Sequence, residues 1–215
     1  MTEIAKDSIR ARADSVAPLP DRTGFKSILC RAVQICKRHR DFYFETRDPL
    51  LAPISVIVTT LLSRSYEACV KTVVYESEFD LLLDVVKRMP EHIDQFGISG
   101  SHWNIRNETT TGENFAEKWN RDPRLVTAFF GWHVQAVADI EVLKTVKGLD
   151  QIEESLGRSF GKRPVTKAME AFTHDLSKAR NAGTLSVAPV VGLIANAGAV
   201  KAATGVRKNT FFGGR

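Results

Sequence analysis

The chain has 215 residues, of which 43% are hydrophobic and 26% are charged. This balance is typical of a globular protein and excludes a disordered or an integral membrane chain. The three cysteines are an odd number with no metal-type spacing, so no disulfide framework is expected. The N-terminus lacks the apolar segment of a signal peptide, and no apolar run approaches the roughly 20 residues of a membrane span. We therefore expect a cytoplasmic protein with no membrane partner.

The net charge of +5 is unevenly distributed along the chain. Residues 22–47 carry seven basic and two acidic side chains, and residues 158–215 carry ten basic and two acidic ones. Between them, residues 48–157 carry ten basic and seventeen acidic side chains. Two basic blocks of this kind are suited to phosphate binding, although solvated basic faces would give the same pattern.

An amphipathic helix with a cationic stripe is predicted over residues 25–44, after a short helix and a linker over residues 1–24. Residues 54–75 are rich in β-branched side chains, which favour a strand. Their length and the preceding Pro53 favour a buried helix instead. We predict the helix, and a further one over residues 79–89.

The second half of the chain is predicted to be mostly helical. A loop over residues 97–112 can hold a short β-ribbon at 102–106. Helices are expected over residues 113–119, 122–147, 149–160 and 164–181.

Three parts follow from this pattern. Residues 1–24 are predicted to be a linker with a short helix, and residues 25–182 a helical unit. Residues 183–215 are rich in glycine and alanine without a sustained period and are predicted to be a flexible tail.

A polymerase-type nucleotidyl transfer site needs a Gly-Ser turn and clustered carboxylates, because two Mg²⁺ ions must bridge the reacting oxygens. Gly100-Ser101, Asp139 and Glu141 suggest such a set. Residues two apart on a helix point in different directions, however, so both acids are expected to be ordinary surface acids. His39 is expected to pack or to cap. We predict no catalytic residue and no metal site within this chain.

The strongest constellation for ligand binding is a basic stretch of the first long helix together with Ser55 at the start of the next one. Arg31 and Arg38 are seven residues apart and are predicted to align two guanidinium groups for phosphate oxygens, with Lys37 and Arg40 nearby. The helix N-terminus at Ser55 adds backbone N–H groups that favour an anion. A solvated face paired with acids of the same helix is the alternative.

Several segments resemble one known family. They are LCRAVQICKRHRDFYF at 29–44, APISVIVTTLLSRSY at 52–66, VKRMP at 86–90, ENFAEKWN at 113–120 and LDQI at 149–152, with GTLSVAP and VRKNTFFG in the tail. They are similar to the C-terminal half of bacterial cGAS/DncV-like nucleotidyltransferases, the cyclic-oligonucleotide synthases of CBASS anti-phage systems.

This resemblance implies a mainly α fold, the helical lobe of a polymerase-β-like, OAS-like nucleotidyltransferase whose catalytic sheet lobe is absent here. The complete enzymes use Mg²⁺ to join ATP, GTP or other NTPs into cyclic di- or trinucleotides that activate an effector. The resemblance maps phosphate contacts onto Arg31 and Ser55. Related enzymes stack an aromatic residue after that serine, where this chain has Val56.

The resemblance also implies partners. The metal carboxylates would come from a catalytic lobe outside this chain, through a truncated gene, a miscalled start or a split synthase, so the chain is expected to be inactive alone. The Gly213-Gly214 end suggests a ubiquitin-like conjugation system as a further partner, with simple tail disorder as the alternative. From the basic blocks, a helical nucleic-acid-binding module is the competing function.

Overall fold

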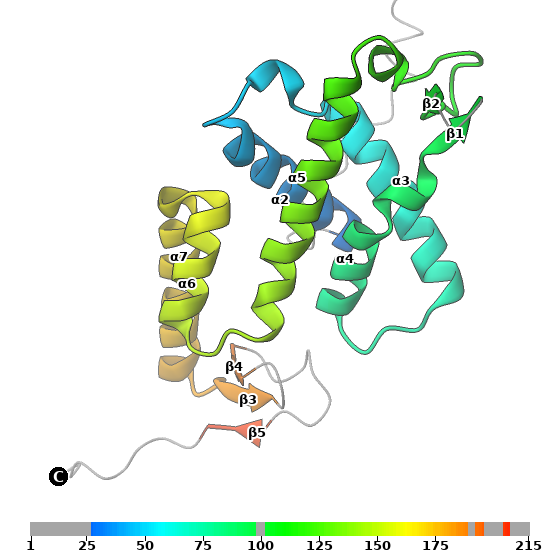
Figure 1. Cartoon of the computed structure of the whole chain (residues 1–215). Helices are drawn as coiled ribbons and strands as arrows, with labels where there is room; N and C mark the ends of the chain where they lie inside the picture. The colour runs from blue at the N-terminus through cyan, green and yellow to red at the C-terminus, as the bar shows by residue number, and fades with distance from the viewer. Residues whose placement is uncertain (1–26, 98–101, 189–191, 196–203, 207–215) are drawn as a thin grey trace, which may run out of the picture.

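A computed structural model describes residues 27–97, 102–188, 192–195 and 204–206. The predicted linker and short helix over residues 1–24 lie outside these residues. The described part is mainly helical, with a few short strands at its edges (Figure 1).

Four helices form the central bundle, and each matches a predicted helix. They are α2 (Ile28–Phe44), α3 (Ser55–Thr72), α4 (Glu78–Lys87) and α5 (Pro123–Glu141). α2 contacts the other three, so it lies at the centre of the packing. The helix over the β-branched residues of α3 is thus confirmed. A short 3₁₀ helix, η1 (Pro49–Leu51), precedes α3, and another, η5 (Val142–Lys144), continues α5.

The helix boundaries follow capping chemistry. The Ser27 hydroxyl accepts a hydrogen bond from the Cys30 N–H at 3.3 Å, which starts α2. The Asp122 carboxylate does the same for the Arg124 N–H at 3.1 Å, and Pro123 occupies the first turn of α5. The start of α5 is the one that the sequence predicted, whereas α2 begins at Ile28 rather than at residue 25.

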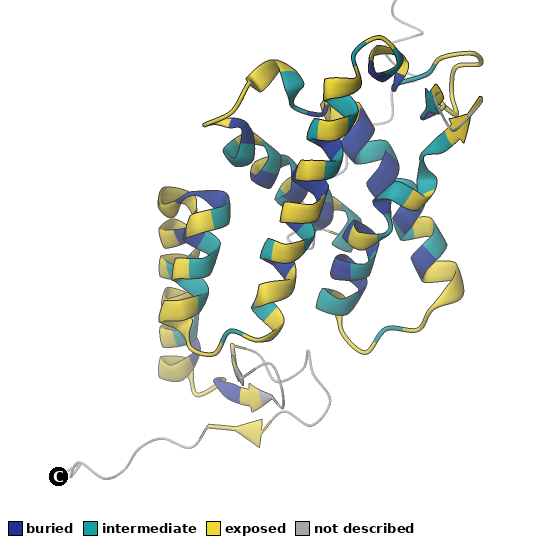
Figure 2. Cartoon of the chain, viewed as in Figure 1, coloured by how far each residue is buried: buried dark blue, intermediate teal, exposed yellow. Residues whose placement is uncertain are grey.

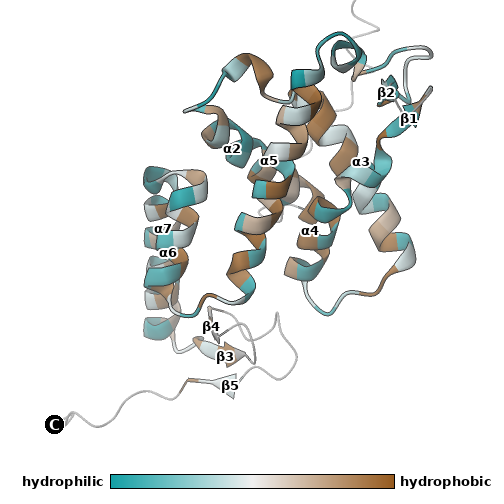
Figure 3. Ribbon diagram, viewed as in Figure 1, coloured by the Kyte–Doolittle hydropathy of each residue, from teal (hydrophilic) through white to brown (hydrophobic). Residues whose placement is uncertain are grey.

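The core lies between these four helices, where their apolar faces meet (Figures 2 and 3). Its fully buried large side chains include Ile57, Leu61 and Leu62 of α3 and Phe129 and Trp132 of α5. Burying such a side chain contributes about 1.5–3 kcal/mol relative to leaving it in water, so this cluster accounts for much of the stability.

The segment Pro49–Thr72, α3 with its preceding turn, contains an 18-residue window and is long and apolar enough to cross a membrane, by length and composition alone. The expectation that no apolar run reaches that length was therefore wrong. Of that window, 33% is buried. Ile57, Leu61 and Leu62 are among its buried residues, so the core uses part of its apolar surface.

Two antiparallel helices stand beside the bundle. α6 (Leu149–Phe160) contacts α2, and α7 (Lys162–Ala182) packs on α6. Gly161 alone connects them, with φ of 88°. Gly183 ends α7 in the left-handed conformation.

A two-stranded ribbon covers one end of the bundle. β1 (Asp94–Phe96) pairs antiparallel with β2 (His102–Asn104), after the 3₁₀ helix η2 (Met89–His92). The helix predicted over 113–119 is instead η4 (Glu117–Asn120). The cause is Asn114, whose side chain bonds the backbone of Trp103, Ile105 and Ala116 and so holds its segment extended beside β2.

Short strands follow α7 in the region that the sequence predicted to be a flexible tail. β3 (Ser186–Ala188) lies between β4 (Gly192–Ile194) and β5 (Thr204–Gly205) in an antiparallel sheet. Strands of two or three residues give no detectable period, which is why the sequence did not indicate them.

Candidate functional site

The structure does not bring Arg31 and Arg38 together. The Arg31 guanidinium donates to the Glu78 carboxylate at 2.7 Å and so links α2 to the start of α4. Arg38 donates through Nε to the Phe160 carbonyl at 2.9 Å, at the end of α6. The predicted alignment of their guanidinium groups for one phosphate is not found, because each group binds a different helix. Lys37 is half-buried and has no hydrogen-bond or ion-pair partner among the residues described.

Ser55 lies where the sequence placed it, exposed at the N-terminus of α3, and the arginine beside it is Arg40. Arg40 Nη1 donates to Ser55 Oγ and to the Pro53 carbonyl, both at 3.0 Å. Arg31 lies nine residues before Arg40, about 13 Å away along α2 at a rise of about 1.5 Å per residue. No side chain caps the start of α3. The first N–H groups of α3 and the Ser55 hydroxyl lie beside the Arg40 guanidinium, and this helix end favours an anion. Arg40 also donates through Nη2 to the Asp41 carboxylate at 2.6 Å, so the sequence-based alternative of pairing with an acid of the same helix holds for this arginine.

A hollow of about 450 Å³ runs along α3 from this end. The α3 groove, as we call it, is lined by Val56, Thr59, Thr60, Ser63, Arg64, Glu67, Arg106, Asn107, Glu108, Thr109 and Phe115. Thr59 lies one helical turn after Ser55 and donates to its carbonyl at 2.9 Å. The groove thus combines apolar surface with hydroxyl and amide groups, the mixture that small-molecule sites use.

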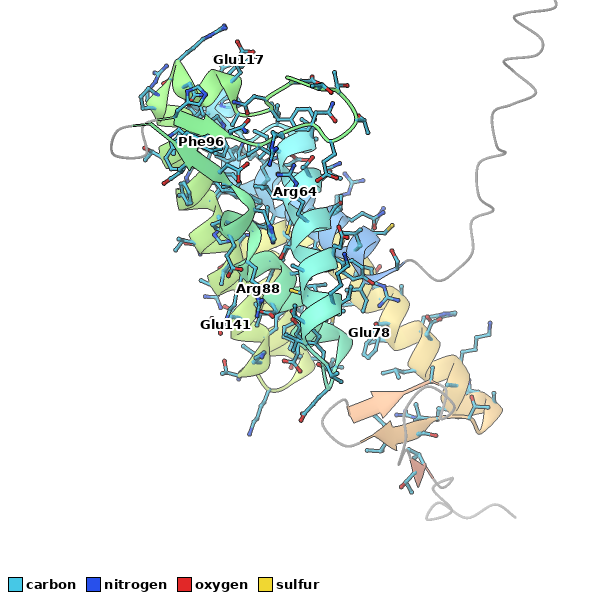
Figure 4. All side chains as sticks on the ribbon, turned by 90° about the vertical axis from the view of Figure 1, so that its right-hand side faces the viewer. Arg64, Glu78, Arg88, Phe96, Glu117 and Glu141 are labelled. Atoms are coloured by element: carbon cyan, nitrogen blue, oxygen red, sulfur yellow. The ribbon has the colours of Figure 1, made fainter. Side chains whose placement is uncertain are left out.

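Arg64 holds the far wall of the α3 groove. It donates to the Arg106 carbonyl at 2.7 Å and to the Glu108 carboxylate at 3.1 Å, which ties the loop after β2 to α3 (Figure 4). The sequence analysis did not select Arg64 or Arg106. They are 42 residues apart, and no motif links them.

A second hollow of about 730 Å³ adjoins the α3 groove across Arg64 and Arg106. Four carboxylates line it, those of Glu91, Asp94, Glu108 and Glu113, against these two arginines and one histidine. The excess of carboxylates disfavours phosphate. Throughout the described ranges, no three His, Cys, Asp or Glu side chains are grouped to hold a metal ion. The described residues therefore do not fit the Mg²⁺ that the family resemblance implies.

Asp139 is not the ordinary surface acid that the helix spacing predicted. Its Oδ2 accepts from His39 Nε2 at 3.0 Å, and Trp132 Nε1 donates to His39 Nδ1 at 3.0 Å. His39 is buried, which confirms that it packs, and burial lowers its pKa against the raising effect of Asp139. Glu141 instead pairs with Lys87 at 2.7 Å. The two acids bind different helices, as their spacing predicted.

Two features singled out from the sequence, Gly100-Ser101 and Gly213-Gly214, lie outside the described residues.

Comparison with known proteins gives one informative relative. No family model matches the chain. A protein of Roseivirga ehrenbergii named c-di-GMP synthase is 28% identical over 188 residues, which cover 87% of this chain and 47% of the relative. The chain thus spans about half the length of the curated relative it matches. Over most of its length, this helical chain is similar to part of a protein named as a cyclic dinucleotide synthase.

Proposed function

We propose that this chain is the helical, nucleotide-binding part of a nucleotidyltransferase that makes a cyclic dinucleotide from NTPs in CBASS anti-phage defence. The similarity to a c-di-GMP synthase over 87% of the chain supports it. The family resemblance of the segments at 29–44 and 52–66, which form α2 and much of α3, also supports it.

The contact of Arg40 with Ser55, which directly precedes the groove-lining residue Val56, is the observation that carries this proposal. In this proposal, a nucleotide phosphate contacts the Ser55 hydroxyl and the first N–H groups of α3, and Arg40 supplies positive charge. The nucleoside lies along Val56 and Thr59. Since Val56 offers no ring, apolar contact with Val56 and Phe115 replaces base stacking.

The catalytic carboxylates are proposed to come from a part of the protein outside these 215 residues, corresponding to the other half of the relative. The described residues do not supply a Mg²⁺ site. Exposed apolar side chains in η1 and around the start of α3 are available to contact such a part; they are Leu50, Ile54 and Val56. In this proposal the chain alone binds NTPs without converting them.

Nucleotide binding to the purified chain tests the proposal. Isothermal titration with GTP and with ATP should give binding that Arg40→Gln or Ser55→Ala weakens by about tenfold, the effect of losing one or two charge-assisted contacts. Lys71→Ala is the matched control, because Lys71 is an exposed cation at the other end of α3. Equal affinities for Arg40→Gln and the parent chain would remove the α3 groove as the site.

A second measurement separates the competing function. Incubation of the chain with ATP, GTP and Mg²⁺ should give no cyclic product by mass spectrometry, and robust product would contradict the external origin of the carboxylates. Tight, strongly salt-dependent binding to duplex nucleic acid without NTP binding would favour a nucleic-acid-binding module instead.

A further inference from the structure

A separate hollow of about 380 Å³ lies between the end of α2, α5 and the end of α6. It is lined by His39, Phe42, Tyr43, Thr46, Arg47, Gln135, Asp139, Arg158 and Ser159, none of which lines the α3 groove. Its volume is near the lower end of the range for small-molecule sites, about 300–1,000 Å³. The hollow is therefore of a size for one small ligand.

One wall of this hollow carries a fixed carboxylate with unused acceptor capacity. Asp139 Oδ2 accepts from His39 Nε2, and Oδ1 accepts from Gln135 Nε2 at 2.9 Å. Each carboxylate oxygen can accept a further hydrogen bond. The side chain of Asp139 remains 22% exposed.

His39 does not cancel the charge of Asp139. The indole N–H of Trp132 is a donor only, so His39 Nδ1 must be the acceptor of that bond and Nε2 must carry the hydrogen given to Asp139. The imidazole is neutral in this arrangement, because protonating Nδ1 would set two donors against each other. Asp139 is thus oriented by a buried neutral group and keeps its negative charge.

Two arginines also line the hollow, Arg47 from just after α2 and Arg158 from α6. Arg47 donates to the Tyr43 carbonyl at 2.6 Å, with its guanidinium 3.8 Å from the centre of the Tyr43 ring. Arg158 lies 3.7 Å from Glu154 and is 70% exposed. Within the described residues, neither arginine forms an ion pair with Asp139. Both guanidinium groups keep free donors beside a separate, unneutralised acceptor.

We propose that this hollow is a second ligand site, for a mononucleotide with a guanine base. Guanine presents two neighbouring donors, N1–H and the 2-amino group, which match the two oxygens of the Asp139 carboxylate. The phosphate carries charge for Arg47 and Arg158. Adenine lacks that pair of donors and would leave Asp139 unpaired.

The site is separate from the α3 groove but lies next to Arg40 along α2. His39 and Arg40 are consecutive on α2, and the first orients Asp139 while the second contacts Ser55. This inference concerns a different site from the proposed function and stands without it.

Titration of the whole chain with GMP, AMP and inorganic phosphate tests the site. GMP should bind at least tenfold more tightly than AMP, and phosphate more weakly than either. Asp139→Asn keeps an acceptor for His39 but exposes an amide to the base, so it should abolish the preference for GMP and leave AMP binding unchanged.

Further variants keep the test decisive if Asp139→Asn does not fold, as judged by its thermal unfolding. Arg158→Ala, at an exposed position, should weaken GMP and AMP equally, by about tenfold. Arg121→Ala, an exposed arginine elsewhere, is its control. Arg40→Gln should leave the GMP preference intact. Equal binding of GMP and AMP, a GMP preference lost in Arg40→Gln, or an unchanged GMP affinity in Arg158→Ala would overturn the proposal.

Discussion

Gly161 connects α6 to α7 in a backbone conformation that residues with a side chain rarely adopt. Because it also lies against Arg38, substituting Gly161 tests the role of that arginine. The Gly161 backbone has φ of 88° and ψ of 139°. A Cβ atom built there would lie 2.8 Å from Arg38 Nη2 and 3.2 Å from the Phe42 ring. Gly161→Ala therefore adds both backbone strain and a clash, and the clash displaces the guanidinium that bonds the Phe160 carbonyl.

Gly148, just before α6, separates these two costs. Its φ of 93° and ψ of 141° are almost the same, and nothing lies within 4 Å of a Cβ built there. Gly148→Ala should cost the backbone strain alone, about 1–3 kcal/mol. Gly161→Ala should cost about 1–2 kcal/mol more, the range for a lost hydrogen bond from a partly exposed charged group.

Urea denaturation followed by circular dichroism measures both variants. Repeating Gly161→Ala in an Arg38→Ala background should reduce its excess over Gly148→Ala by about 1 kcal/mol, because the closest contact is then gone. An excess that is unchanged by Arg38→Ala, or equal costs at the two glycines, would refute the view that Arg38 anchors the α6–α7 turn.

Two further predictions concern stability. Burial lowers the pKa of His39 and of His133 below the ordinary value of about 6.5. At pH values between the folded and the unfolded pKa, the unfolded chain therefore binds more protons than the folded chain. The free energy of unfolding should consequently fall as the pH falls from 7.5 to 5.5, as measured by urea midpoints. His133→Gln should flatten this dependence and the exposed His174→Gln should not, and a flat profile in the parent chain would contradict it. Leu61→Ala should lower the free energy of unfolding by about 2–5 kcal/mol, because it leaves a cavity in the core. Val74→Ala, at a 98% exposed position, should change it little. Similar thermal midpoints for the two variants would contradict the assigned core.

Local chemistry explains what the sequence predicted well. The apolar period, the cap at Asp122 and the glycine after α7 are properties of neighbouring residues, so they are visible without the fold. The helix predicted over residues 149–160 has the same bounds as α6. The short element near Asn114 was misplaced, because its conformation depends on hydrogen bonds to a strand about ten residues away.

The sequence by itself determined that this is a mainly helical chain with its basic side chains concentrated on particular segments, and the position of Ser55 at a helix start. Only the tertiary structure decided which arginine reaches Ser55, because seven-residue spacing places Arg31 and Arg38 on one side of α2 but does not say which helices cover that side. It also decided that Asp139 faces a buried histidine rather than solvent. Side chains a hundred residues apart meet through packing, and periodicity describes only the helix on which each one lies.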